Sequence, residues 1–229
     1  IVGVVTLTGV GFRLGFVVIQ TAGDISNFFS NIWPISFFSF EDLRLFFSLV
    51  LIAISCIIMG AGIPTTATYI ILVAVAAPAL AQLGIEPLVA HFFVFYYGVL
   101  ADITPPVALA AYAASGIAKS NPFKTGNTAF RLGIAKALVP FVFVYSPSLL
   151  LITGEFQTNQ LIITLVGTLI GIALIGIAFS GYWFRPLSKY EQILIGIGSL
   201  FFVAPGTGSM IIGLIIILPM LFLQFFKKN

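Results

Sequence analysis

Charged residues are scarce in this sequence, and their scarcity excludes most soluble proteins. Only 7% of the 229 residues are charged, whereas 60% are apolar, and the mean hydropathy is +1.17. Soluble globular domains carry roughly a quarter charged residues, so the composition indicates a chain that lies in lipid. The net charge of +3 comes from a few loop residues and forms no basic stripe, which argues against a nucleic acid partner.

Cysteine and histidine are equally scarce, since Cys56 and His91 are the only residues of their kinds. A single cysteine excludes an internal disulfide, and one cysteine with one histidine provides no set of zinc or redox ligands. The sequence also lacks the HExxH motif, the GxSxG motif and a P-loop. We therefore expect neither an enzyme nor a bound cofactor, and an ATP-driven pump would need a second chain.

The long uncharged runs are candidate membrane spans, because a helix needs about 20 residues to cross the bilayer core. Residues 132–153 and 160–184 each fit one crossing. Residues 192–226 are interrupted by a Pro-Gly pair and predict two short spans joined by a turn. The chain begins at Ile1 without the features of a signal peptide, so we expect it to start partway through a larger protein.

The run 45–83 is too long for one span and is divided by a Gly/Pro/Thr segment at 60–66. The two arms have about 15 residues, or roughly 22 Å of helix each, which is short of a full crossing. This length favours a re-entrant helical hairpin whose tip stops inside the membrane, where protein or water must surround it. Two full, thin spans are the alternative.

The run 88–118 is also too long for one span and contains a break. Pro105 and Pro106 donate no backbone hydrogen bond and disfavour a helical residue before them. The helix should therefore end near Ile103 and Thr104, with half-helices of about 12 residues on either side. This pattern predicts a discontinuous transmembrane helix in an all-α polytopic membrane protein.

The break and the hairpin tip contain the candidate functional residues. Asp102 would cost about 2.5 to 3.5 kcal/mol at bilayer depth, so it is a candidate functional group. Backbone carbonyls freed at a break, with a carboxylate and hydroxyls, suit sodium. The predicted cation site consists of Gly60, Gly62, Pro64, Thr65, Thr66, Asp102, Ile103, Thr104 and Pro105. The predicted substrate contacts are Thr65, Thr66, Thr68 and Thr104.

Purely structural roles for the same residues stay open at this point. Asp102 could simply cap the second half-helix or meet a buried base. Small residues and threonines are also common where membrane helices pack closely. The observation that favours a site is the pair of consecutive interrupted segments, each with threonine and proline at its break.

Basic residues orient the chain. One short loop region contains no acidic residue and four basic ones: Lys119, Lys124, Arg131 and Lys136. The positive-inside rule places this loop in the cytoplasm. Arg185 and Lys189 then fall on the same side, and both ends of the hairpin lie on the outer side, so that its tip enters from outside.

Four stretches of the sequence resemble a known family. They are GAGIPTTATYI at 60–70, APAL at 77–80, HFFVFYYG at 91–98 and ITPPVALA at 103–110. They are similar to the fused membrane subunit of tripartite ATP-independent periplasmic (TRAP) transporters, especially the group associated with TAXI-type binding proteins. The resemblance covers residues 1–153 and is indistinct in residues 154–229, which we expect to add further spans.

The resemblance implies an elevator-type secondary transporter in the bacterial or archaeal cytoplasmic (inner) membrane. In that family a periplasmic solute-binding protein delivers an organic acid, and sodium, which is cargo rather than a cofactor, drives uptake. The hairpin 45–83 and the broken helix 88–118 resemble the second half of the large subunit. Because no counterpart of the first hairpin is present, the expected partners include the remaining half of the permease, besides membrane lipid and the organic acid.

Two other functions stay as alternatives. A noncatalytic packing subunit or inactive fragment would need no site, but it predicts continuous helices rather than paired breaks. A membrane-embedded enzyme that uses Asp102 would need a second acid, a histidine or a metal partner at similar depth, and the sequence offers none.

Overall fold

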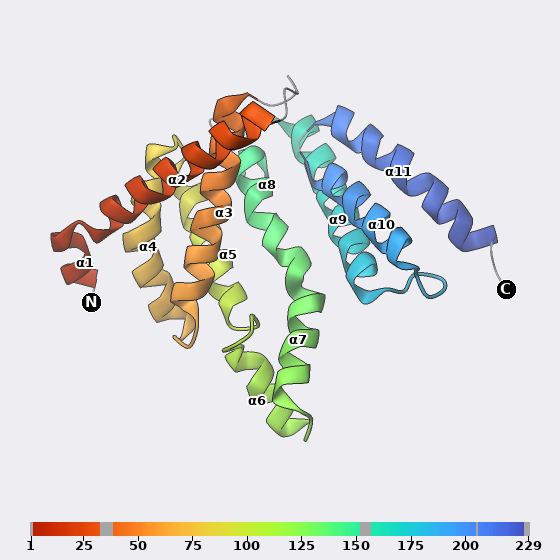
Figure 1. The fold of residues 1–229 in the computed structure, drawn as a ribbon, viewed down its shortest axis with the longest axis horizontal. Coiled ribbons are helices and arrows are strands. Elements are labelled where there is room, and N and C mark those ends of the chain that lie inside the picture. The colour runs from red at the N-terminus through yellow and green to blue at the C-terminus, as the bar shows by residue number, and fades with distance from the viewer. Residues whose placement is uncertain (1, 33–38, 152–156, 205, 227–229) are drawn as a thin grey trace. The chain divides into compact units, whose positions relative to one another are not determined.

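The computed structural model describes residues 2–32, 39–151, 157–204 and 206–226, and this part of the chain is almost entirely helical (Figure 1). Within these ranges no strand forms beyond one isolated bridge between Tyr182 and Pro186. Five segments among the described residues are long and apolar enough to cross a membrane: Phe40–Gly60, Thr65–Gln82, Pro122–Tyr145, Thr158–Ser180 and Thr207–Phe226. The predicted all-α polytopic membrane fold is confirmed.

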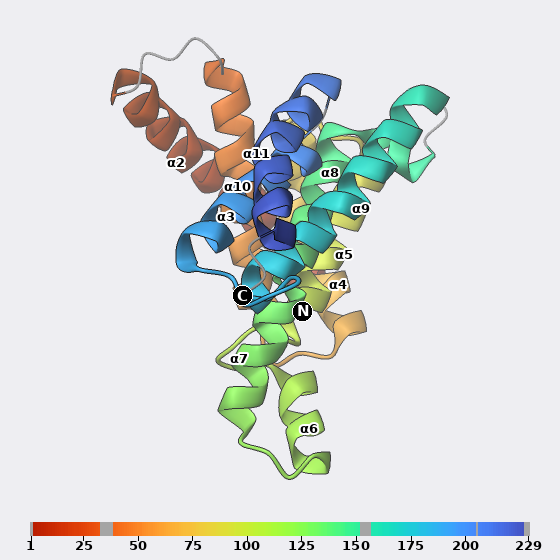
Figure 2. The ribbon, with the colours of Figure 1, turned by 90° about the vertical axis from the view of Figure 1, so that its right-hand side faces the viewer.

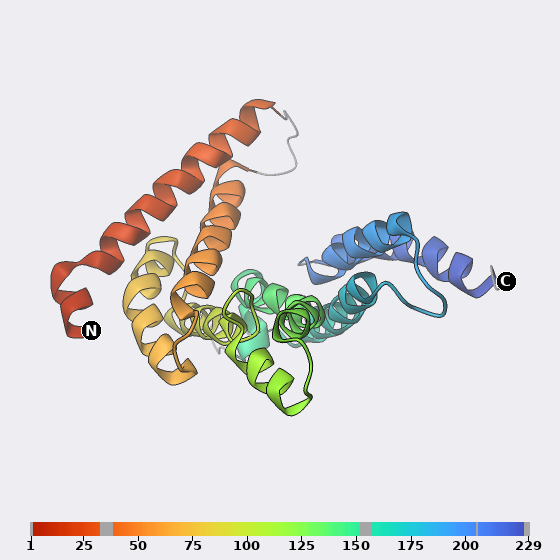
Figure 3. The ribbon, with the colours of Figure 1, turned by 60° about the horizontal axis from the view of Figure 1, so that its bottom comes forward.

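The helices form two compact units, Ile1–Phe123 and Lys124–Asn229. The first unit contains α1 (Val2–Thr8), α2 (Val10–Ile32), α3 (Phe40–Gly60), α4 (Thr65–Gln82), α5 (Pro87–Ala101) and α6 (Leu109–Ile117). Helices α3 and α4 are joined by a short turn, and both α2 and α5 pack against each of them (Figures 1 and 3). Fully buried side chains of α3, α4 and α5, such as Leu49, Leu72 and Phe93, form the core of this unit.

The two arms of the hairpin are longer than predicted. Helix α3 begins five residues before position 45, because Ser39 caps it: the Ser39 Oγ accepts from the Asp42 backbone N–H at 3.1 Å. Asp42 Oδ2 in turn accepts from the Ser39 N–H at 3.1 Å, which completes a capping box. The expected arms of about 15 residues were wrong, since α3 includes its charged first turn and α4 begins at Thr65, inside the segment expected to be the tip. With 21 and 18 residues, both arms are long enough to cross a membrane, so a re-entrant hairpin stays a prediction.

The predicted interruption of the run 88–118 is present. Helix α5 ends at Ala101 and α6 begins at Leu109, and turns occupy the residues between them. The two half-helices have 15 and 9 residues rather than equal lengths. The Pro105–Pro106 peptide bond within the break is cis.

The second unit contains α7 (Pro122–Gly133), whose first two residues belong to the first unit, η1 (Ile134–Leu138), α8 (Val139–Tyr145), η2 (Pro147–Leu150), α9 (Thr158–Ser180), α10 (Lys189–Val203) and α11 (Thr207–Phe226). Helix α10 packs against both α9 and α11 (Figures 1 and 2). The buried side chains between them form one apolar cluster: Leu174, Ala178, Leu187, Ile195, Phe202 and Ile217. Two helices occupy the run 192–226 as expected, but only α11 is long and apolar enough to cross a membrane, so a second span there stays a prediction.

The span expected at 132–153 is displaced. The apolar helical segment runs from Pro122 to Tyr145 instead. Proline is favoured in the first turn of a helix, which explains the early start, and Pro147 cannot continue the α-helix that precedes it. The last two residues of the expected range lie outside the described residues.

Candidate functional site

The tip between α3 and α4 is a four-residue turn that needs a glycine. Gly62 has φ of 81°, a left-handed conformation that other residues rarely adopt. The Ile63 N–H donates to the Gly60 carbonyl at 3.3 Å, and the buried Thr68 donates its hydroxyl to the Ile63 carbonyl at 3.0 Å. Pro64 precedes α4 and gives it no side-chain cap. The first-turn amides of α4 are therefore free to meet a ligand.

The break between α5 and α6 is held by backbone hydrogen bonds that span the two half-helices. The Ala110 N–H donates to the Asp102 carbonyl at 3.1 Å, and the Ala108 N–H donates to the Thr104 carbonyl at 3.1 Å. Ala108 is fully buried and has φ of 35°, a left-handed conformation that is strained for alanine. The Tyr112 hydroxyl donates to the Pro106 carbonyl at 2.6 Å. These contacts hold the loop in one conformation.

The tip and the break lie in contact, where α3 and α5 end and α4 begins. A Cβ atom on Gly60 would lie 3.0 Å from the Cβ of Ala101, the last residue of α5. A Cβ atom on Gly62 would lie 3.5 Å from Cγ1 of Val107 in the break. The glycines therefore let the turn approach the end of α5 closely, and the structure brings together the two segments that the sequence pointed to.

The four candidate threonines have different environments. Thr65 and Thr66 are exposed in the first turn of α4, where their hydroxyls can reach a solute. Thr68 is 1% exposed, and its hydrogen bond to the Ile63 carbonyl stabilises the tip. Thr104 is half-buried and donates its hydroxyl to the Leu100 carbonyl at 2.7 Å, which leaves its oxygen lone pairs able to accept. In this structure Thr68 has a structural role.

Asp102 stands at the end of α5 with a half-buried side chain. The Asp102 carboxylate does not cap α6, although a capping role was one possible structural explanation. The N-cap residue of α6 is Ala108, and no side chain caps this helix. Neither of the two ion pairs among the described residues involves Asp102. The same part of the chain contains no cluster of three acidic, histidine or cysteine residues that could hold a metal ion. A cation here would therefore need other oxygen ligands besides the Asp102 carboxylate.

Backbone carbonyls of the break supply such oxygens. In the described break, the carbonyls of Ile103, Pro105 and Val107 accept no hydrogen bond, whereas those of Asp102 and Thr104 do. Val107 was not among the residues predicted from the sequence. The sequence carried no signal for it, because the missing amides of Pro105 and Pro106 free carbonyls that precede them, whereas the Val107 carbonyl is free because of how the break folds.

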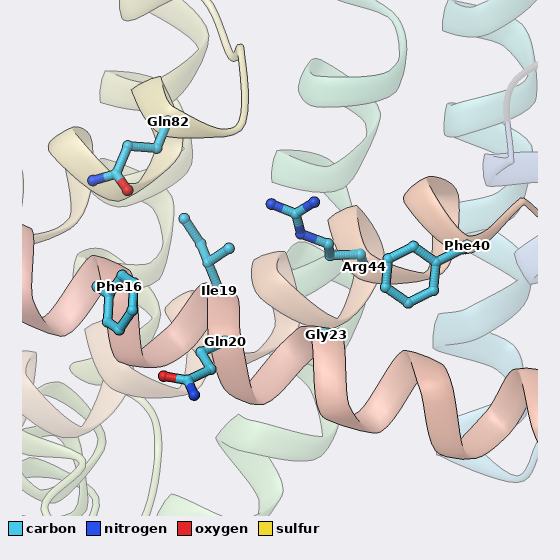
Figure 4. Close-up of a pocket in the computed structure, with 7 residues that line it drawn as sticks. All are labelled: Phe16, Ile19, Gln20, Gly23, Phe40, Arg44 and Gln82. Carbon is cyan, nitrogen blue, oxygen red and sulfur yellow. The ribbon is translucent and has the colours of Figure 1, made fainter.

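A separate groove of about 420 Å³ lies at the other end of the hairpin arms (Figure 4). Figure 4 shows Arg44 reaching from the start of α3 into the space between α2 and the end of α4. The residues that line the groove are mostly apolar: Phe16, Ile19, Gln20, Gly23, Phe40, Arg44 and Gln82. No residue of the predicted site lines this groove, so it is distinct from the tip and the break.

Residues 1–158 match the family model described as "Tripartite ATP-independent periplasmic transporter, DctM component". The chain belongs to this family. The match covers the tip, the break and the helices that carry them, which confirms the resemblance to the large membrane component of TRAP transporters. TRAP transporters work with a periplasmic binding protein and a small membrane subunit. Comparisons with curated proteins and with solved structures found no match. The TAXI-associated subgroup and the assignment to the second half of the subunit stay predictions.

Proposed function

We propose that this chain is the membrane permease component of a secondary transporter that imports organic acids across the cytoplasmic membrane. A periplasmic solute-binding protein delivers the acid, and an inward sodium gradient drives its uptake. Membership of a transporter family supports the general function. The contact between the tip and the break supports the site, because it joins two interrupted helices where backbone groups are unpaired.

The unpaired carbonyls of the break make the cation half of the proposed site. Hard cations such as sodium prefer oxygen ligands, and unwound helix segments supply them in transporters. The carbonyls of Ile103, Pro105 and Val107, the Thr104 hydroxyl and the Asp102 carboxylate are oxygen ligands within one short loop. The negative charge of Asp102 would offset the charge of the ion.

The start of α4 makes the organic acid half of the proposed site. A helix N-terminus carries partial positive charge and unpaired amides, which attract a carboxylate. Thr65 and Thr66 add exposed hydroxyls to this turn. Because Gly62 places the turn against Val107, an acid at the α4 N-terminus and a cation at the break would lie side by side. Mutual attraction between them would couple the two fluxes.

A packing subunit without transport activity is the alternative. It accounts less well for the strained Ala108 and for the uncapped start of α4, since a purely structural helix pair favours satisfied backbone groups.

The proposal predicts uptake by the complete transporter, reconstituted in liposomes with its binding protein and its other membrane components. An inward sodium gradient should drive accumulation of a radiolabelled organic acid, and Asp102→Asn should abolish sodium dependence while preserving the shape of the side chain. Asp24→Asn is a matched control, because Asp24 is an exposed carboxylate on α2 that lies outside the site. Sodium-dependent uptake by Asp102→Asn at the normal rate would contradict the site.

A second measurement tests the site without uptake. Cys56 is the only cysteine and is 1% exposed, so Cys56→Ala gives a cysteine-free chain for labelling. Thr66→Cys in that background should react with a water-soluble maleimide, and sodium should slow the reaction compared with potassium. Equal labelling rates in both salts would argue against a cation site beside the tip.

A further inference from the structure

Basic and acidic residues are unequally distributed in the second unit. Its described residues contain five basic side chains but one acidic side chain, Glu191. Arg131 donates from Nη2 to the Phe179 carbonyl at 2.9 Å, which places it at the C-terminal end of α9. Lys189 opens α10 after a short loop that begins at Gly181. Arg131 and Lys189 therefore lie at the same end of α9 and α10.

The one acid at this end is already neutralised inside the unit. Glu191 Oε1 lies 2.6 Å from Arg185 Nη2 and accepts from Gln224 Nε2 at 3.1 Å. Glu191 Oε2 accepts from the Ser188 N–H at 2.7 Å. Gln224 is 2% exposed, so this cluster joins the loop, α10 and α11 in the interior. Arg131 and Lys189 form no ion pair among the described residues, and their charges face outward.

Aromatic side chains occur in the loop between α9 and α10 and in the first turn of α10, at the same end as these charges. The loop after α9 is closed by hydrogen bonds from the Leu187 N–H to the Gly181 carbonyl at 2.8 Å and from the Trp183 N–H to the Arg185 carbonyl at 3.2 Å. Trp183 packs against the apolar cluster of the unit. Phe184 stacks on Trp183 with ring centroids 5.7 Å apart and packs against Phe225 of α11 at 4.8 Å, yet 53% of its surface is exposed. Tyr182 and Tyr190 are 57% and 82% exposed.

The position of this loop fits a membrane surface. Helix α9 is one of the segments long enough to span the bilayer, so the residues that follow it lie at the level of the lipid headgroups. Tyrosine and tryptophan are enriched at that level, and basic residues there attract anionic lipids. The basic residues also mark this end as cytoplasmic.

We propose that Arg131, Lys189 and the exposed rings of Tyr182, Phe184 and Tyr190 form a binding surface for the headgroups of anionic phospholipids, which anchors the second unit at the cytoplasmic membrane surface. The rings enter the interface between headgroups and acyl chains, and the two cations contact lipid phosphates. Arg185 is a positioning residue, because its bond to Glu191 holds the loop.

Fluorescence quenching of Trp183 tests this surface in this chain. Trp33→Phe leaves Trp183 as the only tryptophan. The protein is reconstituted in phosphatidylcholine vesicles that contain equal mole fractions of either brominated phosphatidylglycerol or brominated phosphatidylcholine. Brominated phosphatidylglycerol should quench Trp183 more strongly than brominated phosphatidylcholine, and the ratio of the two measures the preference for anionic lipid. Lys189→Gln should lower this preference about fivefold, because one basic residue near the surface contributes about 1 kcal/mol. High salt should lower it as well.

Matched variants separate charge from folding. Arg131→Lys should keep the preference, and Arg131→Gln with Lys189→Gln should remove it. The side chain of Lys189 makes no ion pair or hydrogen bond within the described residues, so Lys189→Gln changes charge without breaking a side-chain contact. Arg44→Gln, a basic site on α3 in the other unit, should leave the preference unchanged. Equal quenching by both lipids in the parent protein, or an undiminished preference in the double variant, would overturn the proposal.

Discussion

Polar groups occur in two regions of this apolar chain: the tip and break of the first unit, and the polar cluster around Glu191 in the second unit. The two regions differ in how far their polar groups are hydrogen-bonded. At the tip and break, the carbonyls of Ile103 and Pro105 accept no hydrogen bond among the described residues. In the second unit, both carboxylate oxygens of Glu191 are bonded, to Arg185, Gln224 and Ser188. Unpaired polar groups at membrane depth are costly. The unpaired carbonyls of the break favour a function, whereas the fully bonded carboxylate of Glu191 favours stability.

Loss of the Glu191 carboxylate should give the largest effect on stability. Glu191→Ala leaves the partly buried Arg185 without its counter-ion and the buried Gln224 without an acceptor. We expect a loss of about 3 kcal/mol, measured as the free energy of unfolding in mixed micelles. The rate of uptake per folded transporter should not change. If uptake is lost while the fold is intact, the division between a stabilising and a functional polar region is wrong.

Gly167 in the second unit should affect the packing of α9 against α10 and not transport. A Cβ atom on Gly167 would lie 2.7 Å from the Phe202 carbonyl oxygen, which belongs to the backbone of α10 and cannot move easily. Gly167→Ala should therefore destabilise the unit by about 2 kcal/mol. Gly176→Ala is the matched control on the same helix, since nothing lies within 4 Å of its Cβ position. Equal thermal midpoints for the two variants would show that α9 and α10 are less closely packed.

At the tip, substitution of Gly60 should affect sodium affinity more than stability. A Cβ atom on Gly60 would lie 3.0 Å from Ala101 and 3.1 Å from the Thr68 methyl group, so the tip must shift by a few tenths of an ångström. We expect Gly60→Ala to cost about 1 kcal/mol of stability but to weaken apparent sodium affinity in uptake about fivefold or more. Gly116→Ala, with open space at its Cβ position, should change neither quantity. An unchanged sodium affinity in Gly60→Ala would separate the tip from the cation site.

The smallest expected effect concerns the hydrogen bond between α4 and α5. The Tyr69 hydroxyl and His91 Nδ1 lie 2.7 Å apart, and no other histidine exists in the chain. Hydrogen bonds between membrane helices contribute about 0.6 kcal/mol on average, so Tyr69→Phe should lower stability by about that amount. Thermal denaturation in detergent measures it. A loss comparable to that of Glu191→Ala would mean that α4 and α5 depend on this bond as much as the second unit depends on its cluster.

Much of the fold followed from composition and from the two helix breakers. Scarce charge and long apolar runs predicted a polytopic helical protein, and the Pro105-Pro106 pair predicted the interruption that the structure shows between α5 and α6. Helix starts were less predictable. The charged first turn of α3 was taken for a loop, although the Ser39 capping box makes it helical. The α7 segment began ten residues early for a related reason, because Pro122 can open a helix.

The candidate site was predictable in its location but not in its details. Glycine, proline and threonine at two consecutive breaks pointed to both segments. The sequence could not separate the exposed Thr66 from the buried Thr68, because both lie in the same turn and only the packing of α4 against Gly98 distinguishes them. Nor did it show Val107, whose place beside Gly62 depends on how the break folds back.

The sequence alone determined that this chain lies in a membrane, that its spans are helices and that two of its hydrophobic runs are interrupted. These properties depend on transfer free energy and on the missing amide of proline, which act on each segment locally. Only the tertiary structure decided that the two interruptions meet, and that Glu191 bonds to both Arg185 and Gln224. Such contacts join residues far apart in the chain, so they depend on how the helices pack rather than on any local pattern.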